Sequence, residues 1–427
     1  MGHIGPLSQR LPFAERRSGV TSYYDSFIEP RKEISALPSI NKVLSRRSRL
    51  IPLSYSTSAR GLPLNTNSGL SLFQRRSKVI DQELSVARTD SVLPCVLGWR
   101  GQSSGSKIPK QRVVWMFPMS QNIRENRFFR PLHEVLKRLE SFSAWISMDA
   151  VDDSVTRLLA RRDTVGGTIL SSDFSKFDQT MGPAQLKWYF NLLRNVYDVK
   201  FHEDIDFLQY VLAYIPLVCT LDETFIGVHG WGSGSNLTNQ ADSVVNHHAQ
   251  ITSMEVPEEG IILVQGDDAA LNVYDVDRHL THLSDLGFEA NASKQYISDT
   301  VVHYLQRVHS ANYKVNGRAV GVYPTMRALN SLMGQERFHD DWSSVMVSLR
   351  TLSILENVRN HPIFTRFVKY IMEKGDKSLK ENTARIVKDR SYIKRAKAIP
   401  GFLPSYNEAG KLDGIRRFKS VRLILES

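Results

Sequence analysis

Two adjacent acids interrupt a pair of strand-like segments, and this feature constrains the fold more than any other. An apolar run at residues 261–265 ends in Gly266-Asp267-Asp268, and a second apolar run follows at residues 269–273. A glycine before the acids suits a tight turn with a positive φ angle. Carboxylates held between two apolar strands are costly unless a cation compensates their charge. The pattern predicts a β-hairpin whose tip holds a metal, with an ordinary solvated turn as the alternative.

A second acidic segment lies upstream, where the apolar residues 168–172 lead into Asp173, followed by Asp178. Two strands that each deliver an acid to the same edge of a sheet bring three oxygen ligands together. Such a set suits Mg²⁺ or Mn²⁺ bound partly by substrate phosphates. No cluster of histidine or cysteine in the sequence indicates a softer metal. Two ordinary structural roles remain open: Asp173 caps a helix that begins near Pro183, or Asp178 pairs with Lys176.

Glycine and serine dominate a third segment, residues 230–236, and a helical pattern follows it to residue 246. Thr238, Asp242 and Val245 are spaced at i, i+4 and i+7. One face of this helix therefore carries a hydroxyl and a carboxylate toward whatever the loop covers. A loop of this composition is more often a linker than a ligand clamp. Its position between the two acidic segments favours binding.

The order of these three segments resembles motifs A, B and C of viral RNA-dependent RNA polymerases. The middle segment reads Ser-Gly-Ser at residues 233–235 and Asp-Ser-Val-Val-Asn at residues 242–246, which most resembles the double-stranded RNA viruses of the partitivirus and picobirnavirus type. Residues 107–118 are similar to motif F, a basic strand that grips the incoming triphosphate. Residues 302–307 are similar to the motif E hairpin, and Lys294 lies where a motif D lysine is expected.

Such an enzyme performs nucleotidyl transfer, in which a 3′-hydroxyl attacks an α-phosphate and two metals about 4 Å apart stabilise the attacking and leaving oxygens. The resemblance implies Asp173 and Asp267 as bridging ligands of two Mg²⁺ ions, or of Mn²⁺ in their place. Asp268 would bind one ion or tune the site. Lys294 would be the general acid for departing pyrophosphate, although a solvated loop lysine is an equal interpretation. Three basic residues would neutralise the triphosphate: Lys107, Lys110 and Arg112.

The resemblance also implies a group of residues that senses the ribose. Asp178 and Ser233 would reach the 2′-hydroxyl, with Thr238 nearby, and this hydroxyl separates RNA chemistry from DNA chemistry. Many single-stranded RNA virus polymerases have Asn where this chain has Asp242. Adjacent carboxylates repel each other unless one is protonated or a donor intervenes. Asn246, one helical turn later, is expected to supply that donor.

Charge divides the chain into three parts. Residues 1–130 contain 21 Lys or Arg against 8 Asp or Glu, residues 131–309 contain 12 against 25, and residues 310–427 contain 22 against 11. Basic segments therefore flank the acidic part that contains the expected metal ligands. This arrangement favours RNA template and nascent RNA held on either side, with two solvated basic faces as the alternative. The candidate template contacts are Arg46, Arg47, Arg49, Arg75 and Arg76.

The expected architecture is a mixed α/β right hand. Fingers would take residues 1–165 with part of residues 180–230. The palm, with motifs A to E, would take residues 166–310, and a mainly helical thumb would take residues 311–427. The palm is expected to be an antiparallel sheet with helices on one face, since this is the fold that the resemblance implies.

Local patterns add detail to this architecture. Apolar spacing predicts helices over residues 130–148, over residues 183–214 and from residue 323 onward, with extended segments over residues 287–308. The only cysteines are Cys95 and Cys219, so no disulfide framework is expected. No apolar stretch is long enough to cross a bilayer and no signal peptide is recognised, so the resemblance implies a location in the virion or the host cytoplasm.

Two alternatives remain. A reverse transcriptase shares the palm and the paired aspartates, but it usually has a Tyr-x-Asp-Asp turn and a bulky apolar gate where this chain has Asp178. A non-catalytic RNA-binding protein that kept the fold has no chemical need for three carboxylates, which repel RNA when no metal is bound. The polymerase interpretation implies ribonucleoside triphosphates as substrates, RNA as template and product, and a viral capsid protein as a further candidate partner.

Overall fold

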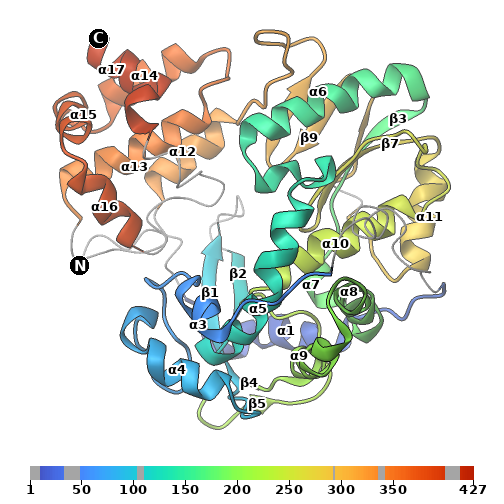
Figure 1. Cartoon of the computed structure of the whole chain (residues 1–427). Helices are drawn as coiled ribbons and strands as arrows, with labels where there is room; N and C mark the ends of the chain where they lie inside the picture. Colours follow the sequence, from blue (N-terminus) through green and yellow to red (C-terminus); the bar gives the residue numbers. More distant parts are fainter. Residues whose placement is uncertain (1–9, 33–48, 103–109, 292–293, 335–341, 400–413) are drawn as a thin grey trace.

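A computed structural model describes residues 10–32, 49–102, 110–291, 294–334, 342–399 and 414–427. Figure 1 shows helices packed around a central sheet, with the C-terminal helices gathered into a bundle of their own. The sequence predicts a mixed helix and sheet fold with an antiparallel central sheet, and this prediction is confirmed.

The central sheet carries the acidic segments. Its strands are β3 (Thr168–Ser172), β6 (Ile262–Gln265), β7 (Asp268–Val273) and β8 (Tyr296–Ser298), in the order β6-β7-β3-β8. Every neighbouring pair is antiparallel, and Ser172 lies opposite Ala269 in the register. The hairpin predicted around Gly266 is therefore formed by β6 and β7. The C-terminal end of β3 lies beside the start of β7, next to the hairpin turn.

Helices cover both faces of this sheet, whereas one covered face was expected. On one face, Ile169, Leu263 and Ala270 pack against α6 (Met148–Val165). On the other face, Leu170 and its neighbours pack against three helices: α8 (Pro183–Val196), α10 (Thr238–Ile251) and α11 (Val276–Asp285). The difference follows from the strands themselves, because their successive residues are apolar and point alternately to the two faces.

The N-terminal half forms a second sheet with the order β2-β1-β4-β5. β1 (Cys95–Gln102) pairs antiparallel with β2 (Lys110–Met116) and parallel with the short β4 (Leu217–Val218), which in turn pairs with β5 (Thr224–Phe225). A segment after residue 200 thus joins a sheet begun before residue 100. The surrounding elements are α1 (Phe13–Asp25), α3 (Tyr55–Arg60), η2 (Arg76–Lys78), α4 (Ile80–Ala87), α5 (Met119–Leu136) and α9 (His202–Tyr214).

The two segments predicted to be helical are each interrupted. Residues 130–148 contain the end of α5 and the 3₁₀ turn η3 (Glu140–Trp145), and α6 begins only after Ser147, whose hydroxyl accepts from the Ala150 amide. The segment over residues 183–214 is broken between α8 and α9 by η4 (Val199–Phe201). Side-chain caps supply the physical reason, since they satisfy backbone donors where a continuous helix is not formed.

A hairpin and a helical bundle complete the chain. β9 (Val301–Tyr304) and β10 (Arg307–Ser310) form the hairpin expected from the extended pattern. The predicted helices after residue 323 are also present, and they share an apolar core separate from that of the central sheet. They are α12 (Thr325–Met333), α13 (Ser344–Asn357), α14 (Phe364–Lys374), α15 (Leu379–Lys388), α16 (Ser391–Ala398) and α17 (Lys419–Glu426).

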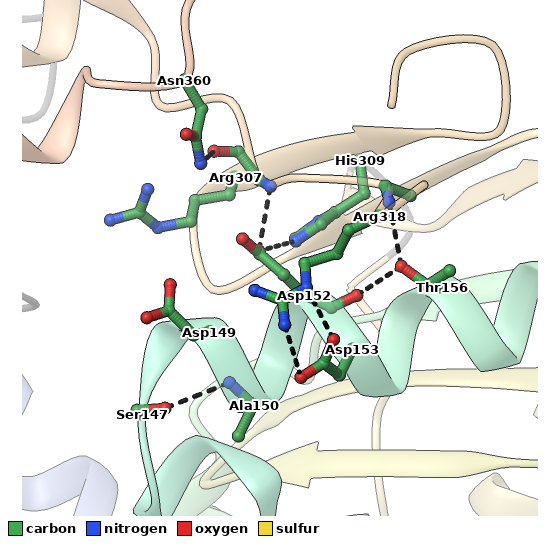
Figure 2. Close-up of polar contacts among 12 residues, drawn as sticks. Ser147, Asp149, Ala150, Asp152, Asp153, Thr156, Arg307, His309, Arg318 and Asn360 are labelled. Carbon is green, nitrogen blue, oxygen red and sulfur yellow. Dashed lines mark hydrogen bonds and ion pairs between the residues drawn. The ribbon is translucent and has the colours of Figure 1, made fainter. Parts of the chain in front are cut away.

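A polar network, buried at Asp152 and His309 and half-exposed at Asp153, joins α6 to the hairpin and to the segment that leads into the bundle (Figure 2). The Asp152 carboxylate accepts from the Gly321 amide at 2.9 Å and contacts the His309 Nε2 at 3.1 Å. Asp153 forms an ion pair with Arg318 at 2.7 Å. These directional contacts fix one arrangement of the hairpin on α6, which apolar packing alone specifies less strictly.

The two cysteines, Cys95 and Cys219, are not bonded to each other or to another cysteine. None of the helices in the described parts of the chain has the length and apolar character needed to cross a membrane.

Candidate active site

The turn between β6 and β7 is held in place by α10. Gly266 has a φ angle of +60°, as the tight-turn prediction requires. Its amide donates to the Ser243 hydroxyl at 2.8 Å, and its carbonyl accepts from the Asn246 side chain at 2.9 Å. Both backbone groups of the turn glycine are therefore satisfied by one helix, which fixes the position of Asp267 and Asp268.

Asp173 follows the end of β3 and is surrounded by residues of the segment before β8. The Lys294 ammonium donates to its carboxylate at 2.7 Å, and the Gln295 side chain donates to its carbonyl at 2.8 Å. The Asn291 amide also donates to that carbonyl at 2.9 Å. Lys294 thus contacts Asp173 although its side chain is mostly exposed, and its role as general acid stays a prediction.

The ordinary roles considered for the upstream acids are not observed. α8 begins at Pro183 as predicted, but its N-cap is Gly182, with Gln185 closing the first turn, and not Asp173. The Lys176 ammonium donates to the Ser22 hydroxyl at 3.1 Å, and no ion pair between Lys176 and Asp178 is formed. The Asp173 carboxylate therefore does not cap α8, and the Asp178 carboxylate does not pair with Lys176.

The carboxylates of Asp173, Asp267 and Asp268 repel one another. Burial raises the pKa of Asp268 to about 7, and the charges of Asp267 and Asp173 add to the effect, whereas Lys294 and Arg327 oppose it. Desolvation by the surrounding protein, and then the charge of Asp173, raise the pKa of Asp267, although this residue is exposed. A cation would relieve this repulsion.

The carboxylate oxygens are the ligand type that Mg²⁺ and Mn²⁺ prefer, so the donor set fits such a metal. Within the part of the chain that the structure describes, no group of three or more His, Cys, Asp or Glu side chains is already arranged around one point that could hold an ion. In this arrangement the Asp173 carboxylate is paired with Lys294 at 2.7 Å.

The basic strand predicted for triphosphate binding is β2. Lys110 and Arg112 are exposed on it, two residues apart and therefore on the same face. The charge of Arg112 lowers the pKa of both Asp178 and Asp267, which places its guanidinium near the acids. Lys107 lies outside the described residues.

The Gly/Ser loop before α10 packs tightly and is not a linker. A side chain at Gly234 would begin 1.8 Å from the Trp115 carbonyl oxygen. The Ser233 hydroxyl contacts the Val113 carbonyl and the Trp115 amide of β2, each at 3.4 Å. Because no β-carbon fits at residue 234, the loop can lie directly against the basic strand.

The helix that follows the loop positions its polar residues differently from the expectation. The Thr238 hydroxyl donates to the Gly232 carbonyl at 2.9 Å and so closes the loop. Asp242 is half-buried, and its Oδ1 has no hydrogen-bond partner among the described residues. Burial raises the pKa of Asp242 well above its usual range, and Asp178 and Asp267 raise it further.

The expected donor from Asn246 to Asp242 is wrong. The Asn246 side-chain nitrogen donates to the Gly266 carbonyl of the hairpin turn. The Asn246 side-chain oxygen accepts from the Gln250 side chain at 3.0 Å. Asn246 does lie one helical turn after Asp242, as expected. Its side-chain donor is taken by the neighbouring hairpin and is therefore not available to Asp242.

Sequence reasoning missed a buried acid beneath the loop. Glu125 on α5 accepts from the Asn236 amide at 2.7 Å, and burial raises the pKa of Glu125 to about 7. The signal available in the sequence was the polar stretch from Ser120 to Asn126, which only Ile123 interrupts. These polar side chains are buried, so they act as internal supports and do not form a solvated face.

Two further residues near the acids were also missed. The Tyr23 hydroxyl of α1 donates to the Asp178 carboxylate at 2.6 Å. Arg327 of α12 acts electrostatically on Asp268. Both come from parts of the chain far from the motifs, and no local pattern marks them.

Two of the candidate template contacts donate hydrogen bonds to other parts of the chain. Arg76 is buried, and its guanidinium donates to the Asn122 side chain at 2.5 Å, so the template role predicted for Arg76 is wrong. Arg49 donates to the Tyr197 carbonyl at 2.9 Å. Arg75 is exposed, whereas Arg46 and Arg47 lie outside the described residues.

Sequence comparison adds to this geometry. Residues 76–316 match the family model described as viral RNA-dependent RNA polymerase. The chain is 36% identical over 414 residues to the potential RNA-dependent RNA polymerase of a human picobirnavirus (strain Human/Thailand/Hy005102/-), a match that covers 88% of this chain and 74% of the relative. It is 28% identical over 244 residues to the RNA-directed RNA polymerase of Cryptosporidium parvum virus 1 (strain KSU-1), which covers 51% of this chain and 45% of that protein.

Structural comparison agrees. The fold is similar to the crystal structure of the RNA-dependent RNA polymerase of a human picobirnavirus, with a TM-score of 0.84 and 32% identity over 99% of this chain and 85% of the other. An insertion loop deletion mutant of such a polymerase gives a TM-score of 0.80 at the same identity and coverage.

Proposed function

The chain belongs to the viral RNA-dependent RNA polymerase family and is the RNA-dependent RNA polymerase of a double-stranded RNA virus, and we propose that Asp173, Asp267 and Asp268 are the carboxylates that carry its nucleotidyl transfer. One observation carries the proposal. The acids come from the end of β3 and from the β6–β7 turn, and the charge of Asp173 raises the pKa of both Asp267 and Asp268, so they form one electrostatic unit that a divalent cation would stabilise.

Two divalent cations, Mg²⁺ or Mn²⁺, would supply charge stabilisation for the attacking 3′-oxygen and the leaving pyrophosphate when bound. Asp173 and Asp267 would hold both ions, with Asp268 on one of them. To hold a cation, the Asp173 carboxylate would give up its ion pair with Lys294. Lys294 is mostly exposed, so breaking this ion pair costs little.

The basic residues near the acids would then act on the triphosphate. Lys294, released from Asp173 but still beside it, would donate a proton to the departing pyrophosphate. Lys110 and Arg112 of β2, with Lys107, would bind the triphosphate oxygens by charge-assisted hydrogen bonds. The observation that supports Arg112 is its electrostatic effect on Asp178 and Asp267.

Sugar selection would depend on Asp178 and Ser233. Both lie at the junction of β2, the Gly/Ser loop and the motif A segment, because the Trp231 amide donates to the Asp178 carbonyl at 2.6 Å. Three residues of α10 would contribute indirectly. Thr238 would close the loop, Asp242 would act through its charge on the neighbouring acids, and Asn246 would hold the hairpin turn. A carboxylate or hydroxyl that accepts from the ribose 2′-hydroxyl favours ribonucleotides.

We further assign residues 1–165 with part of 180–230 to fingers, residues 166–310 to the palm and residues 311–427 to the thumb. The pairing of β1 with β4 supports the interleaving, and the separate apolar core supports the thumb. Template and nascent RNA would lie between the flanking basic segments. A capsid protein as partner and a location in the virion or host cytoplasm complete the proposal.

Incorporation of labelled ribonucleotides on a defined RNA template tests the metal assignment. With Mg²⁺ or Mn²⁺, Asp267→Ala is expected to lower synthesis by at least about 100-fold while RNA binding is retained. Asp277→Ala removes an exposed acid of α11 and serves as the matched control, with synthesis unchanged. Normal synthesis by Asp267→Ala would refute the assignment.

A further inference from the structure

A tyrosine of the N-terminal helix contacts the residue proposed to sense the ribose. The Tyr23 hydroxyl donates to the Asp178 Oδ2 at 2.6 Å, across 155 residues of sequence. Tyr23 is 2% exposed, so this hydroxyl does not exchange its partner freely with water. A short hydrogen bond to a carboxylate is stronger than one between neutral groups.

The position of this hydroxyl is set by rigid packing around the ring. The Tyr23 ring meets the Trp115 ring edge to face, with centroids 5.4 Å apart. The Tyr23 carbonyl accepts from the Gly230 amide at 2.6 Å, so the residue is also tied to the Gly/Ser loop. Tyr23 therefore lies between the basic strand, the loop and the motif A segment, and its side chain cannot swing away without disturbing all three.

The Asp178 carboxylate has capacity left after this contact. An ionised carboxylate accepts about four hydrogen bonds. Tyr23 takes one of them and the backbone amides of residues 178 and 179 take others, which leaves room for a further donor. Burial raises the pKa of Asp178, while the Tyr23 hydroxyl and then Arg112 lower it. The Tyr23 hydroxyl thus favours the ionised form of Asp178, which accepts hydrogen bonds. It opposes the repulsion from Asp242 and Asp267, which lie nearby.

We propose that Tyr23 is a positioning residue for ribose recognition, whose hydroxyl holds the Asp178 carboxylate in the orientation that accepts from the 2′-hydroxyl of the incoming nucleotide. The inference rests on the proposed function, because the contact of Asp178 with the ribose is part of it. It adds a residue of the N-terminal helix α1 to the specificity of the site.

Tyr23→Phe removes the hydroxyl and keeps the ring. The kcat/KM for a ribonucleotide should fall about tenfold, mainly through KM, whereas the kcat/KM for the matching 2′-deoxynucleotide should stay unchanged. Discrimination between the two sugars then falls about tenfold. Tyr24→Phe is the matched control: Tyr24 also packs on Trp115, but its hydroxyl is buried without a hydrogen-bond partner among the described residues. Its discrimination should equal that of the unchanged protein.

The outcomes separate this inference from the proposed function. If Asp178→Ala leaves the discrimination ratio unchanged, the ribose role of Asp178 is wrong. If Asp178→Ala lowers the ratio but Tyr23→Phe does not, or if Tyr23→Phe slows both sugars equally, Tyr23 is not a positioning residue. In the double variant, the loss should equal that of Asp178→Ala alone.

A second measurement covers the case in which Tyr23→Phe does not fold. Replacement of Tyr23 by 4-aminophenylalanine keeps a donor at the end of the same ring. This variant should retain most of the discrimination, because the amino group can donate to Asp178 in place of the hydroxyl. A folded 4-amino variant that has lost the discrimination would overturn the proposal.

Discussion

Replacing Asp268 by Asn should stabilise the metal-free protein. Burial and two neighbouring carboxylates raise the pKa of Asp268 to about 7, compared with about 3.9 for a free Asp. A difference of about 3 pKa units corresponds to about 4 kcal/mol of folding free energy lost when the group is ionised. Part of the side chain contacts solvent, which screens the interaction, so about 2 kcal/mol is expected from Asp268→Asn at pH 8.

The sign of the pH dependence follows from the raised pKa. The folded protein binds a proton at Asp268 more tightly than the unfolded chain does, so this stability is fully present below about pH 4 and is lost as pH rises to about 7. The difference between Asp268→Asn and the unchanged protein should therefore grow from pH 4 to pH 7 and stay constant above it.

Urea unfolding in EDTA at a series of pH values measures this difference. Asp277→Asn, at an exposed position of α11, is the control and should follow the unchanged protein. With saturating Mg²⁺, the unchanged protein should gain stability and Asp268→Asn should gain less, because ligand binding stabilises only the form that binds it. A variant that is no more stable than the unchanged protein at pH 8, or a difference that does not vary with pH, would refute the reasoning.

Three other substitutions test the packing around the site. Gly234→Ala places a β-carbon 1.8 Å from the Trp115 carbonyl oxygen, so the loop must move by about 1 Å and synthesis should fall about 100-fold in the nucleotide incorporation assay. Gly19→Ala, within α1, meets its nearest atom at 3.4 Å and should raise the unfolding free energy by about 0.5–1 kcal/mol, measured by urea titration. Asp152→Ala leaves the buried His309 ring and the Gly321 amide without their acceptor, and the same titration should show a loss of about 3 kcal/mol.

Local patterns predicted the acidic hairpin because its information is contained in a few residues. A glycine with a positive φ angle, two acids and two apolar strands are sufficient to specify the turn around Gly266, and the structure has that turn. The helix after the Gly/Ser loop and the C-terminal helices were predicted for the same reason. Each of these elements is encoded by periodicity or by residues with strong turn preferences.

Contacts between distant segments were not predictable in this way. Nothing near Tyr23 indicates that its hydroxyl reaches Asp178, and nothing near Asn246 indicates that a hairpin uses its amide. Glu125 is a polar residue in a helix, a pattern that normally indicates a solvated face. Its burial depends on a loop more than a hundred residues later, so the fold itself is needed to recognise its role.

The position of β3 in the sheet affects how the chain is made on the ribosome. β3 lies between β7 and β8 in the sheet. Both of its edges therefore stay unpaired until strands about a hundred residues later in the chain have been synthesised. At roughly 5–20 residues per second, this delay lasts roughly 5–20 s, during which an apolar strand has two unpaired edges. We expect chains that terminate before residue 268 to aggregate or require a chaperone, and not to fold as a smaller domain. Translation must therefore run past β7, which ends at Val273, before the acids of this site can come together.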